Sequence, residues 1–253
     1  MTRRRFYAPP GVFNFRTQTA TLTADEARHL REVLRLKVGD EIFVFDGAGK
    51  EFQCRIEESR RDSASLTVIS EVSPARPESP LNLRLAVALL KGEKFDLVVQ
   101  KSTELGVNRI VPVMTKLADI RLRDESDAAK RVTRWQRIAL EAAKQCGRAF
   151  VPEAAAPVSF ESLIQEVDAQ RNLSLLFSER DGLPLQKSVE SSDLELNNIN
   201  ALVGSEGGWT DAELEAARQN GWQIVTLGGR TLRAETAAIA VTTLLQHLAG
   251  DLT

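Results

Sequence analysis

Cysteine is scarce in this chain of 253 residues, which contains only Cys54 and Cys146. Two cysteines are too few for a disulfide framework and indicate a reducing compartment. The basic amino terminus is not followed by the apolar core of a signal peptide, and no apolar run is long enough to span a bilayer. We therefore expect a cytoplasmic protein that has no membrane partner.

Several motifs of common enzyme classes are also missing. No cluster of His, Cys, Asp and Glu has metal-ligand spacing, so we expect no metal. No Gly-x-Gly-x-x-Gly follows a first strand, and no Walker-type lysine follows a glycine loop, which argues against a dinucleotide-dependent enzyme and a nucleotidase. Aromatic residues make up 6% of the chain. Trp135 and Trp209 could stack on bases, but packing is the commoner role for such residues.

The charge that is present is unevenly distributed. The net charge is −2, yet residues 1–40 and 84–150 carry an excess of Lys and Arg, and residues 151–220 an excess of Asp and Glu. A protein that binds a polyanion needs a basic face rather than a basic total. Two unevenly solvated faces would give the same pattern, so charge alone leaves both interpretations open.

Residues 1–73 have the pattern of a small β-rich unit. Strands are expected at 42–45, 52–57 and 65–72, with glycine-containing turns between them. Thr23 and Glu26 have the spacing of a capping box that would begin a helix. Residues 74–80 are rich in proline, which cannot continue a helix or a central strand, so we place the domain boundary there.

From residue 81 onward, strands and helices alternate. Strands are expected at 81–90, 109–113, 173–177, 200–203 and 223–227, and helices at 93–105, 127–147, 159–167, 211–220 and up to about 248. This alternation predicts an α/β fold whose parallel sheet has helices on both faces. The polar residues 181–198 are predicted to form a surface loop.

Two junctions between a strand and glycines carry the prediction of a site. Gly204-Ser-Glu-Gly-Gly208 follows one expected strand, and Gly228-Gly229 follows another. Glycine permits backbone angles closed to other residues, so a ligand can lie against bare backbone, and ligands bind at the carboxyl ends of parallel strands. The two junctions could therefore line one pocket, although tight turns before helices are the commoner meaning of such glycines.

The expected helix over residues 127–148 has a basic face. The residues of this face recur every three or four positions and include one acid; they are Lys130, Arg134, Arg137, Glu141, Lys144 and Arg148. Such a stripe suits a nucleic-acid backbone, because each neutralised phosphate releases counterions. A solvated face with ordinary ion pairs is the alternative.

Five motifs, in order along the chain, resemble those of the RsmE family. They are Arg5-Phe6 with His29-Leu-Arg-Glu-Val-Leu-Arg35, Lys101-Ser-Thr-Glu-Leu-Gly-Val107, Glu141-Ala-Ala-Lys-Gln-Cys-Gly-Arg148, Gly204-Ser-Glu-Gly-Gly208 and Leu227-Gly-Gly-Arg-Thr-Leu-Arg-Ala-Glu-Thr-Ala237. Ser205 replaces the family's proline and Thr231 its isoleucine. Neither change removes a chemical group that the family's motifs require.

The resemblance implies a small-subunit ribosomal RNA (uracil-N3)-methyltransferase of the SPOUT superfamily. It implies a PUA-like RNA-binding β-barrel over residues 1–73 and a methyltransferase domain over 81–253, with a trefoil knot near 199–240. It also implies a homodimer that binds S-adenosylmethionine in the knot and acts on 16S rRNA of the small ribosomal subunit. The alternative is a catalytically inactive RNA-binding ribosome assembly factor, against which the intact glycine loop and Arg233 argue.

Residue roles follow from the same resemblance. The expected cofactor-binding residues are Leu202, Gly204, Glu206, Gly207, Leu227, Gly228, Leu232 and Thr236. Uracil N3 must lose a proton, and Glu206, Glu235, Glu141 or solvent could accept it. Arg233 is expected to anchor the uridine phosphate or to stabilise negative charge on the uracil oxygens, with an ion pair to a nearby acid as the alternative.

The predicted RNA-binding residues are all cationic and come from three parts of the chain. They are Arg3, Arg4, Arg5, Lys94, Arg134 and Arg148. Gln145 and Arg148, at the end of the basic helix, are also expected to approach the active site, from the same subunit or from the partner.

Overall fold

The computed structural model describes residues 3–166, 171–192 and 196–252. The chain divides into two compact units, which we describe separately. The first unit comprises Met1–Glu78 and Leu140–Val151, and the second comprises Ser79–Ala139 and Pro152–Thr253. None of the helices among the described residues is long and apolar enough to cross a membrane.

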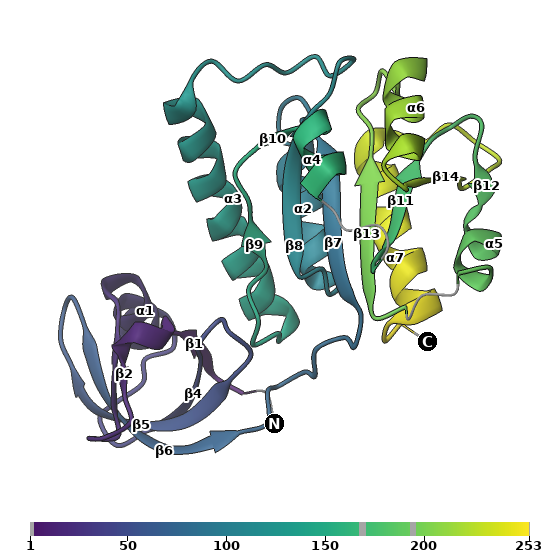
Figure 1. The fold of residues 1–253 in the computed structure, drawn as a ribbon. Helices are drawn as coiled ribbons and strands as arrows, with labels where there is room; N and C mark the ends of the chain where they lie inside the picture. Colours follow the sequence, from purple (N-terminus) through teal and green to yellow (C-terminus); the bar gives the residue numbers. More distant parts are fainter. Residues whose placement is uncertain (1–2, 167–170, 193–195, 253) are drawn as a thin grey trace. The chain divides into compact units, whose positions relative to one another are not determined.

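The first unit is built on a six-stranded sheet with the strand order β1-β4-β5-β6-β3-β2 (Figure 1). The strands are β1 (Arg5–Tyr7), β2 (Phe13–Asn14), β3 (Thr19–Leu22), β4 (Glu41–Phe45), β5 (Glu51–Ser59) and β6 (Ala64–Val72). All pairs are antiparallel except β1 with β4. Phe6, Leu30 and Ile56 are fully buried in its core, which explains the alternation of apolar and polar residues in the sequence.

The helix of the first unit differs from its prediction at its start. α1 (Ala24–Arg28) follows Thr23, but the Thr23 side chain makes no capping hydrogen bond, so the predicted capping box is wrong. Glu26 is buried instead, and its carboxylate accepts hydrogen bonds from the Tyr7 N–H at 3.5 Å and Lys144 Nζ at 2.6 Å. A buried carboxylate needs a charged partner, and the lysine supplies it from outside the helix.

The second unit contains an eight-stranded parallel sheet with the order β10-β8-β7-β13-β11-β14-β12, and with β9 also paired to β8. Its strands are β7 (Asn82–Ala88), β8 (Arg109–Met114), β9 (Glu153–Ala154), β10 (Val158–Ser159), β11 (Leu173–Phe177), β12 (Leu183–Pro184), β13 (Asn198–Val203) and β14 (Gln223–Thr226). Every residue of β11 is buried. Continuous apolar runs are typical of strands that are covered on both faces.

Helices cover both faces of this sheet (Figure 1). α2 (Lys94–Glu104) and α7 (Ala234–Ala249) pack against each other on one face, and α7 contacts β7 and β13. α4 (Phe160–Glu166) and α6 (Asp211–Gln219) cover the other face. The long helix α3 (Glu125–Cys146) contributes residues to both units. The predicted α/β architecture with a parallel sheet is confirmed.

The predicted surface loop over residues 181–198 is wrong in part. It contains β12 and α5 (Leu185–Glu190), where Leu185 and Val189 are buried one helical turn apart. The surrounding polar residues hide this short apolar stripe, because two residues are too few to give a clear periodicity. Residues 193–195 of that prediction, and Val167 at the end of another predicted helix, lie outside the described residues.

Candidate active site

A cavity of about 270 Å³ lies at the carboxyl ends of three parallel strands, β11, β13 and β14. β13 and β14 flank β11, so the loops that follow all three strands meet at one edge of the sheet. The lining is formed by residues 177–179, 203–209 and 226–232, with Ala234, Ala237 and Val241 of α7. The prediction that Gly204 and Gly228 line one pocket is confirmed.

The loop after β13 is held by close packing that only glycine permits. A Cβ added at Gly207 would lie 2.8 Å from the Leu117 carbonyl oxygen, and one at Gly204 would lie 3.0 Å from the Trp209 ring. Both distances are shorter than an ordinary van der Waals contact. The loop ends where Thr210 and Glu213 cap α6 reciprocally in a capping box.

The loop after β14 uses glycine for a different reason. Gly228 and Gly229 have φ angles of 68° and 73°, in the left-handed region, and an added Cβ would meet nothing within 4 Å at either position. The backbone is therefore bare where it borders the cavity, and a ligand can approach it closely. The turn is fixed by the Gly228 N–H, which donates to Thr226 Oγ1 at 3.1 Å.

The lining has the character of a nucleoside site. Ala237, Val241 and Phe177 supply apolar walls, while the two glycine loops supply backbone polar groups. Ser205 is 8% exposed, and its hydroxyl oxygen is buried without a hydrogen-bond partner among the described residues. Buried polar groups in native proteins are almost always paired, so this hydroxyl is available to a ligand.

Lys94 and Glu206 form an ion pair beside the cavity. Lys94 Nζ lies 2.5 Å from Glu206 Oε1 and 4.0 Å from Glu235 Oε2. The hydrogen bond from Lys94 lowers the pKa of the Glu206 carboxyl, and the same bond raises the pKa of Lys94. The pair joins the first residue of α2 to the glycine loop. It also makes Glu206 a weaker base than a free carboxylate.

The predicted catalytic and cofactor-binding residues divide into those that line the cavity and those that do not. Gly204, Glu206, Gly207, Leu227, Gly228 and Leu232 line it. Leu202, Arg233 and Thr236 flank it without lining it. Arg233 is exposed at the N-cap of α7, and its charge acts on Lys94. Glu141 belongs to the first unit, where it is exposed and lies 3.6 Å from Lys144.

Most of the predicted RNA-binding cations have carboxylate partners. Arg134 Nη2 lies 2.5 Å from Asp96 Oδ2, and Lys94 is paired as described. Arg148 is 5% exposed, and its guanidinium lies 2.7 Å from Glu78. Arg4 is exposed on the first unit.

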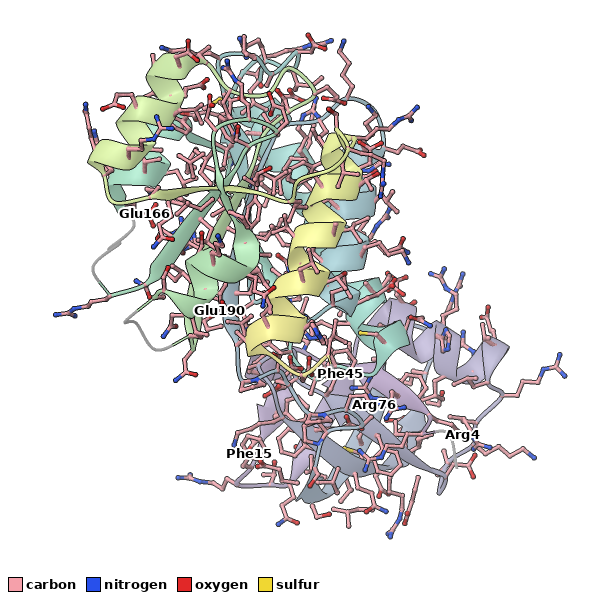
Figure 2. The ribbon with its side chains drawn as sticks, turned by 90° about the vertical axis from the view of Figure 1, so that its right-hand side faces the viewer. Arg4, Phe15, Phe45, Arg76, Glu166 and Glu190 are labelled. Atoms are coloured by element: carbon pink, nitrogen blue, oxygen red, sulfur yellow. The ribbon has the colours of Figure 1, made fainter. Side chains whose placement is uncertain are left out.

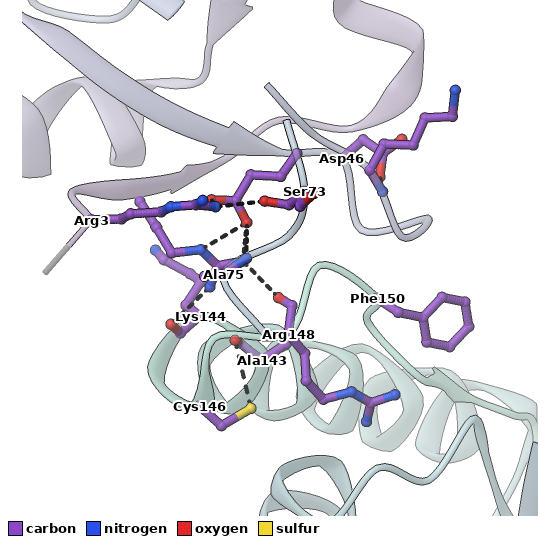
Figure 3. A network of polar contacts seen from close by, with 12 residues as sticks. Arg3, Asp46, Ser73, Ala75, Ala143, Lys144, Cys146, Arg148 and Phe150 are labelled. Carbon is purple, nitrogen blue, oxygen red and sulfur yellow. Dashed lines mark hydrogen bonds and ion pairs between the residues drawn. The ribbon is translucent and has the colours of Figure 1, made fainter. Parts of the chain in front are cut away.

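Arg3 and Arg5 both bind Glu51, which is fully buried. Figure 3 shows this network around Arg3, Ser73 and Ala75. The Glu51 carboxylate also accepts the Ala75 N–H at 3.0 Å. Removing two charges from water is costly unless they are paired and hydrogen-bonded, so this group is a structural network. It leaves Arg3 and Arg5 little freedom to reach an RNA phosphate.

Trp135 and Trp209 pack in the second unit's core. Trp135 is 3% exposed against Phe95, with 4.4 Å between the ring centroids. Trp209 is 2% exposed, and its Nε1–H donates to the Phe177 carbonyl at 2.8 Å. The packing role that the sequence favoured is confirmed for both residues.

Sequence reasoning missed the third wall of the cavity. Ser178 and Glu179 follow β11 and line it, and Arg230 lines it from the loop after β14. The apolar run 173–177 followed by polar residues was a usable signal, because it has the same strand-to-loop form as the two glycine junctions. No group of His, Cys, Asp and Glu among the described residues could hold a metal ion.

Comparison with known proteins gives two family matches that together cover most of the chain. The RNA methyltransferase domain family matches residues 77–246, and the RNA methyltransferase PUA domain matches residues 22–69. Ribosomal RNA small subunit methyltransferase E from Synechocystis sp. is 36% identical over 238 residues, which cover 94% of this chain and 75% of that protein. Its namesake from Bacillus subtilis is 30% identical over 92% of this chain and 93% of that one.

A solved structure extends the likeness to three dimensions. Ribosomal RNA small subunit methyltransferase E from Neisseria gonorrhoeae, bound to S-adenosyl methionine, superposes with a TM-score of 0.86 at 35% identity and covers 100% of both chains. The sequence motifs, the two domain matches and this full-length similarity agree, and the chain belongs to the RsmE family of ribosomal RNA small subunit methyltransferases.

Proposed function

We propose that this protein transfers a methyl group from S-adenosylmethionine to N3 of a uridine in 16S ribosomal RNA. The observation that carries the proposal is the cavity at the ends of β11, β13 and β14, where two glycine loops present bare backbone. The relatives are named for methylation of small-subunit ribosomal RNA, and the similar gonococcal structure contains S-adenosyl methionine. The assignment of uracil N3 as the methylated atom comes from the resemblance of the sequence motifs to those of the RsmE family.

The residues of the cavity fit a nucleoside-containing cofactor. The apolar side chains of Ala237 and Val241 suit an adenine ring, and the open space beside Gly228 and Gly229 lets its edge reach backbone groups. The unpartnered Ser205 hydroxyl adds one side-chain contact. When bound, S-adenosylmethionine supplies an activated methyl group on a sulfonium, so the protein's main task is to hold the acceptor nitrogen in line with it. Such positioning can lower a barrier by roughly 7–11 kcal/mol.

The acceptor side requires a proton to leave uracil N3. Glu206 is held by Lys94, which lowers the pKa of its carboxyl and favours a role in fixing the loop over one as a base. Glu235 is 9% exposed, and its Oε2 accepts no hydrogen bond among the described residues. It lies 4.0 Å from Lys94 Nζ, farther than Glu206 at 2.5 Å, so either Glu235 or solvent is the better acceptor. Glu141 belongs to the first unit and is not among the residues that line this cavity. Arg233, exposed at the start of α7, would stabilise charge on the uracil oxygens or hold the phosphate.

The finer features of the fold belong to the same proposal. We propose a PUA-like barrel over residues 1–73, a linker over 74–80 and a SPOUT methyltransferase domain over 81–253, with a trefoil knot near 199–240. The two family matches support this division, and the position of β13 between β7 and β11 is compatible with a knotted path. The homodimer and the cytoplasmic location remain predictions from the motifs and composition.

The decisive test is methyl transfer in vitro. Purified protein, labelled S-adenosylmethionine and unmethylated small-subunit rRNA or small ribosomal subunits would be incubated, and the digested nucleosides analysed by mass spectrometry. We expect labelled 3-methyluridine. Cofactor binding without any transfer to either substrate would instead support the inactive assembly factor.

A further inference from the structure

The first unit contains a second cavity, of about 970 Å³, that the methyl-transfer chemistry does not use. Its lining comes from four separate segments of that unit: the amino terminus, the residues after α1, the proline-rich segment and the end of α3. The lining residues that matter here are Arg3, Arg4, Arg5, His29, Arg76, Lys144 and Gln145. No carboxylate is among the described residues that line it.

Buried carboxylates neutralise part of this positive charge. Buried Glu51 accepts hydrogen bonds from both Arg3 and Arg5, and buried Glu26 accepts one from Lys144. Lys144 also lies 3.6 Å from the exposed Glu141 carboxylate, so three carboxylates pair with these three cations. These cations are held in place by the ion pairs, so they form a rigid positive floor.

Arg4 and Arg76 add two positive charges to the cavity. Both are exposed, and neither side chain has an ion-pair partner among the residues that the structure describes (Figure 2). Arg76 is positioned by contact with Gly147, because a Cβ at Gly147, whose φ is 92°, would lie 3.0 Å from Arg76 Cγ. The residues just before it are also fixed, since Arg3 Nη1 donates to the Ser73 carbonyl at 2.7 Å and Glu51 accepts the Ala75 N–H.

The chemistry of the cavity selects an anion with several acceptor oxygens. Guanidinium groups bind phosphate through paired N–H donors, and the exposed Gln145 amide can donate a further bond. Glu26 and Glu51 are buried, and Glu141, the exposed carboxylate near Lys144, does not line the cavity. The charged side chains that line the cavity are therefore all cationic among the described residues. An excess of fixed positive charge in a concave site raises the local concentration of a polyanion.

We infer that this cavity is a binding site for a backbone phosphate of the substrate RNA. Arg4 and Arg76 would hold the phosphate, above the floor formed by Arg3, Arg5 and Lys144. The inference rests on the proposed function, because it takes the anion to be RNA. It assigns Arg3 and Arg5 a positioning role, and it adds Arg76, from the proline-rich segment, to the RNA contacts.

The test compares the full-length double variant Arg4→Glu/Arg76→Glu with the wild type. Binding of a fluorescein-labelled transcript of small-subunit rRNA would be measured by anisotropy at several salt concentrations. We expect an affinity at least tenfold lower, and a plot of log affinity against log salt that is shallower by about 0.7–0.9 for each lost phosphate contact. Arg76→Lys should recover part of the affinity, because it restores the charge without the paired donors.

Arg16→Glu is the matched control, because Arg16 is an exposed arginine of the same unit that does not line the cavity. It should bind the transcript like the wild type. The circular dichroism spectrum and the melting curve of every variant should match those of the wild type, which shows that both units are folded. Equal RNA affinity and equal salt dependence in the double variant and the control would overturn the inference.

Two further outcomes separate this inference from the proposed function. If the wild type methylates rRNA but the double variant binds it unchanged, only the phosphate-binding site is wrong. If the wild type transfers no methyl group, the proposed function fails even where the transcript binds at the cavity. Displacement of the transcript by inorganic phosphate, but not by chloride of equal ionic strength, would identify the ligand as the free anion and contradict the assignment to RNA.

Discussion

At the scale of single residues, charge around the active-site cavity is organised by pairs that join separate segments. Lys94 connects the start of α2 to Glu206 in the glycine loop and lies near Glu235 at the start of α7. Arg233, in contrast, is exposed and does not cap its helix through its side chain. A charged side chain left exposed beside a cavity is better placed to meet a substrate than one already bound to a carboxylate.

Arg233→Ala is expected to lower turnover by about 100-fold or more, in the range seen when a group that stabilises developing charge is removed. Affinity for S-adenosylmethionine and the melting temperature should stay close to wild type, because the side chain neither lines the cavity nor caps α7. Steady-state kinetics and calorimetry would measure both. Arg218→Ala, which removes an exposed arginine on α6, is the control. Unchanged turnover in Arg233→Ala would refute the role assigned to it.

The Lys94–Glu206 pair predicts a pH dependence of stability. The lowered pKa of Glu206 means that its contribution is present above the ordinary value of 4.5 and is lost as the pH falls through the folded-state pKa. The raised pKa of Lys94 means that its contribution is present below 10.5 and is lost as the pH rises through the folded-state value.

Lys94→Met should therefore melt below the wild type at neutral pH, with a difference that shrinks in acid and in strong base. The effect will be small, because both side chains are about one-third exposed and solvent screens them. Scanning calorimetry across the pH range would measure it. A difference that stayed constant below pH 4.5 would mean that the pair contributes nothing.

At the scale of elements, the glycine loops show how much a sequence can predict. Glycines directly after an apolar run identified both loops. The requirement at Gly228 is local, a left-handed φ, whereas Gly207 is required by close packing against another segment. The partner at Gly207 was not predictable, since Leu117 is distant in the sequence. The same holds for Arg5 and Glu51, whose pairing across the first unit no periodicity reveals.

Gly207→Ala is expected to weaken S-adenosylmethionine binding roughly tenfold. The new methyl group would lie 2.8 Å from the Leu117 carbonyl oxygen, and overpacking of this kind costs about 1–3 kcal/mol unless the loop moves out of its cofactor-binding position. Calorimetric titration would measure the affinity. Gly11→Ala is the matched control, because an added Cβ there meets nothing within 4 Å. Equal affinities in the two variants would show that close packing of the loop is unimportant for the cofactor.

The cap of α6 allows a prediction for stability. Thr210 accepts a hydrogen bond from the Glu213 N–H at 3.2 Å, and the Glu213 carboxylate accepts from the Thr210 N–H at 3.0 Å and from the Lys116 N–H at 2.9 Å. Thr210→Ala should lower the free energy of unfolding by about 1 kcal/mol. Glu213→Ala should lower it further, because it also removes the partner of the Lys116 N–H. Urea denaturation would rank them, and the reverse order would contradict this account of the cap.

At the scale of the whole molecule, the sequence predicted a β-rich unit followed by alternating strands and helices, and both patterns are present. The short strands β1, β2 and β3 were not predicted, because two to four residues give too little alternation to recognise. The division of α3 between the two units was not predictable either, since its helical periodicity is continuous. Long-range packing decides these features.

The central claim is that the cavity at the carboxyl ends of β11, β13 and β14 is the binding site of the methyl donor. Calorimetric titration of S-adenosylmethionine into the wild type and into Ala237→Phe, whose larger side chain would fill the cavity, tests it most directly. We predict one binding site per chain in the wild type and none, or a much weaker one, in the filled variant, with both proteins equally folded by circular dichroism. Equal binding by the two proteins, or no binding by the wild type, would contradict the claim.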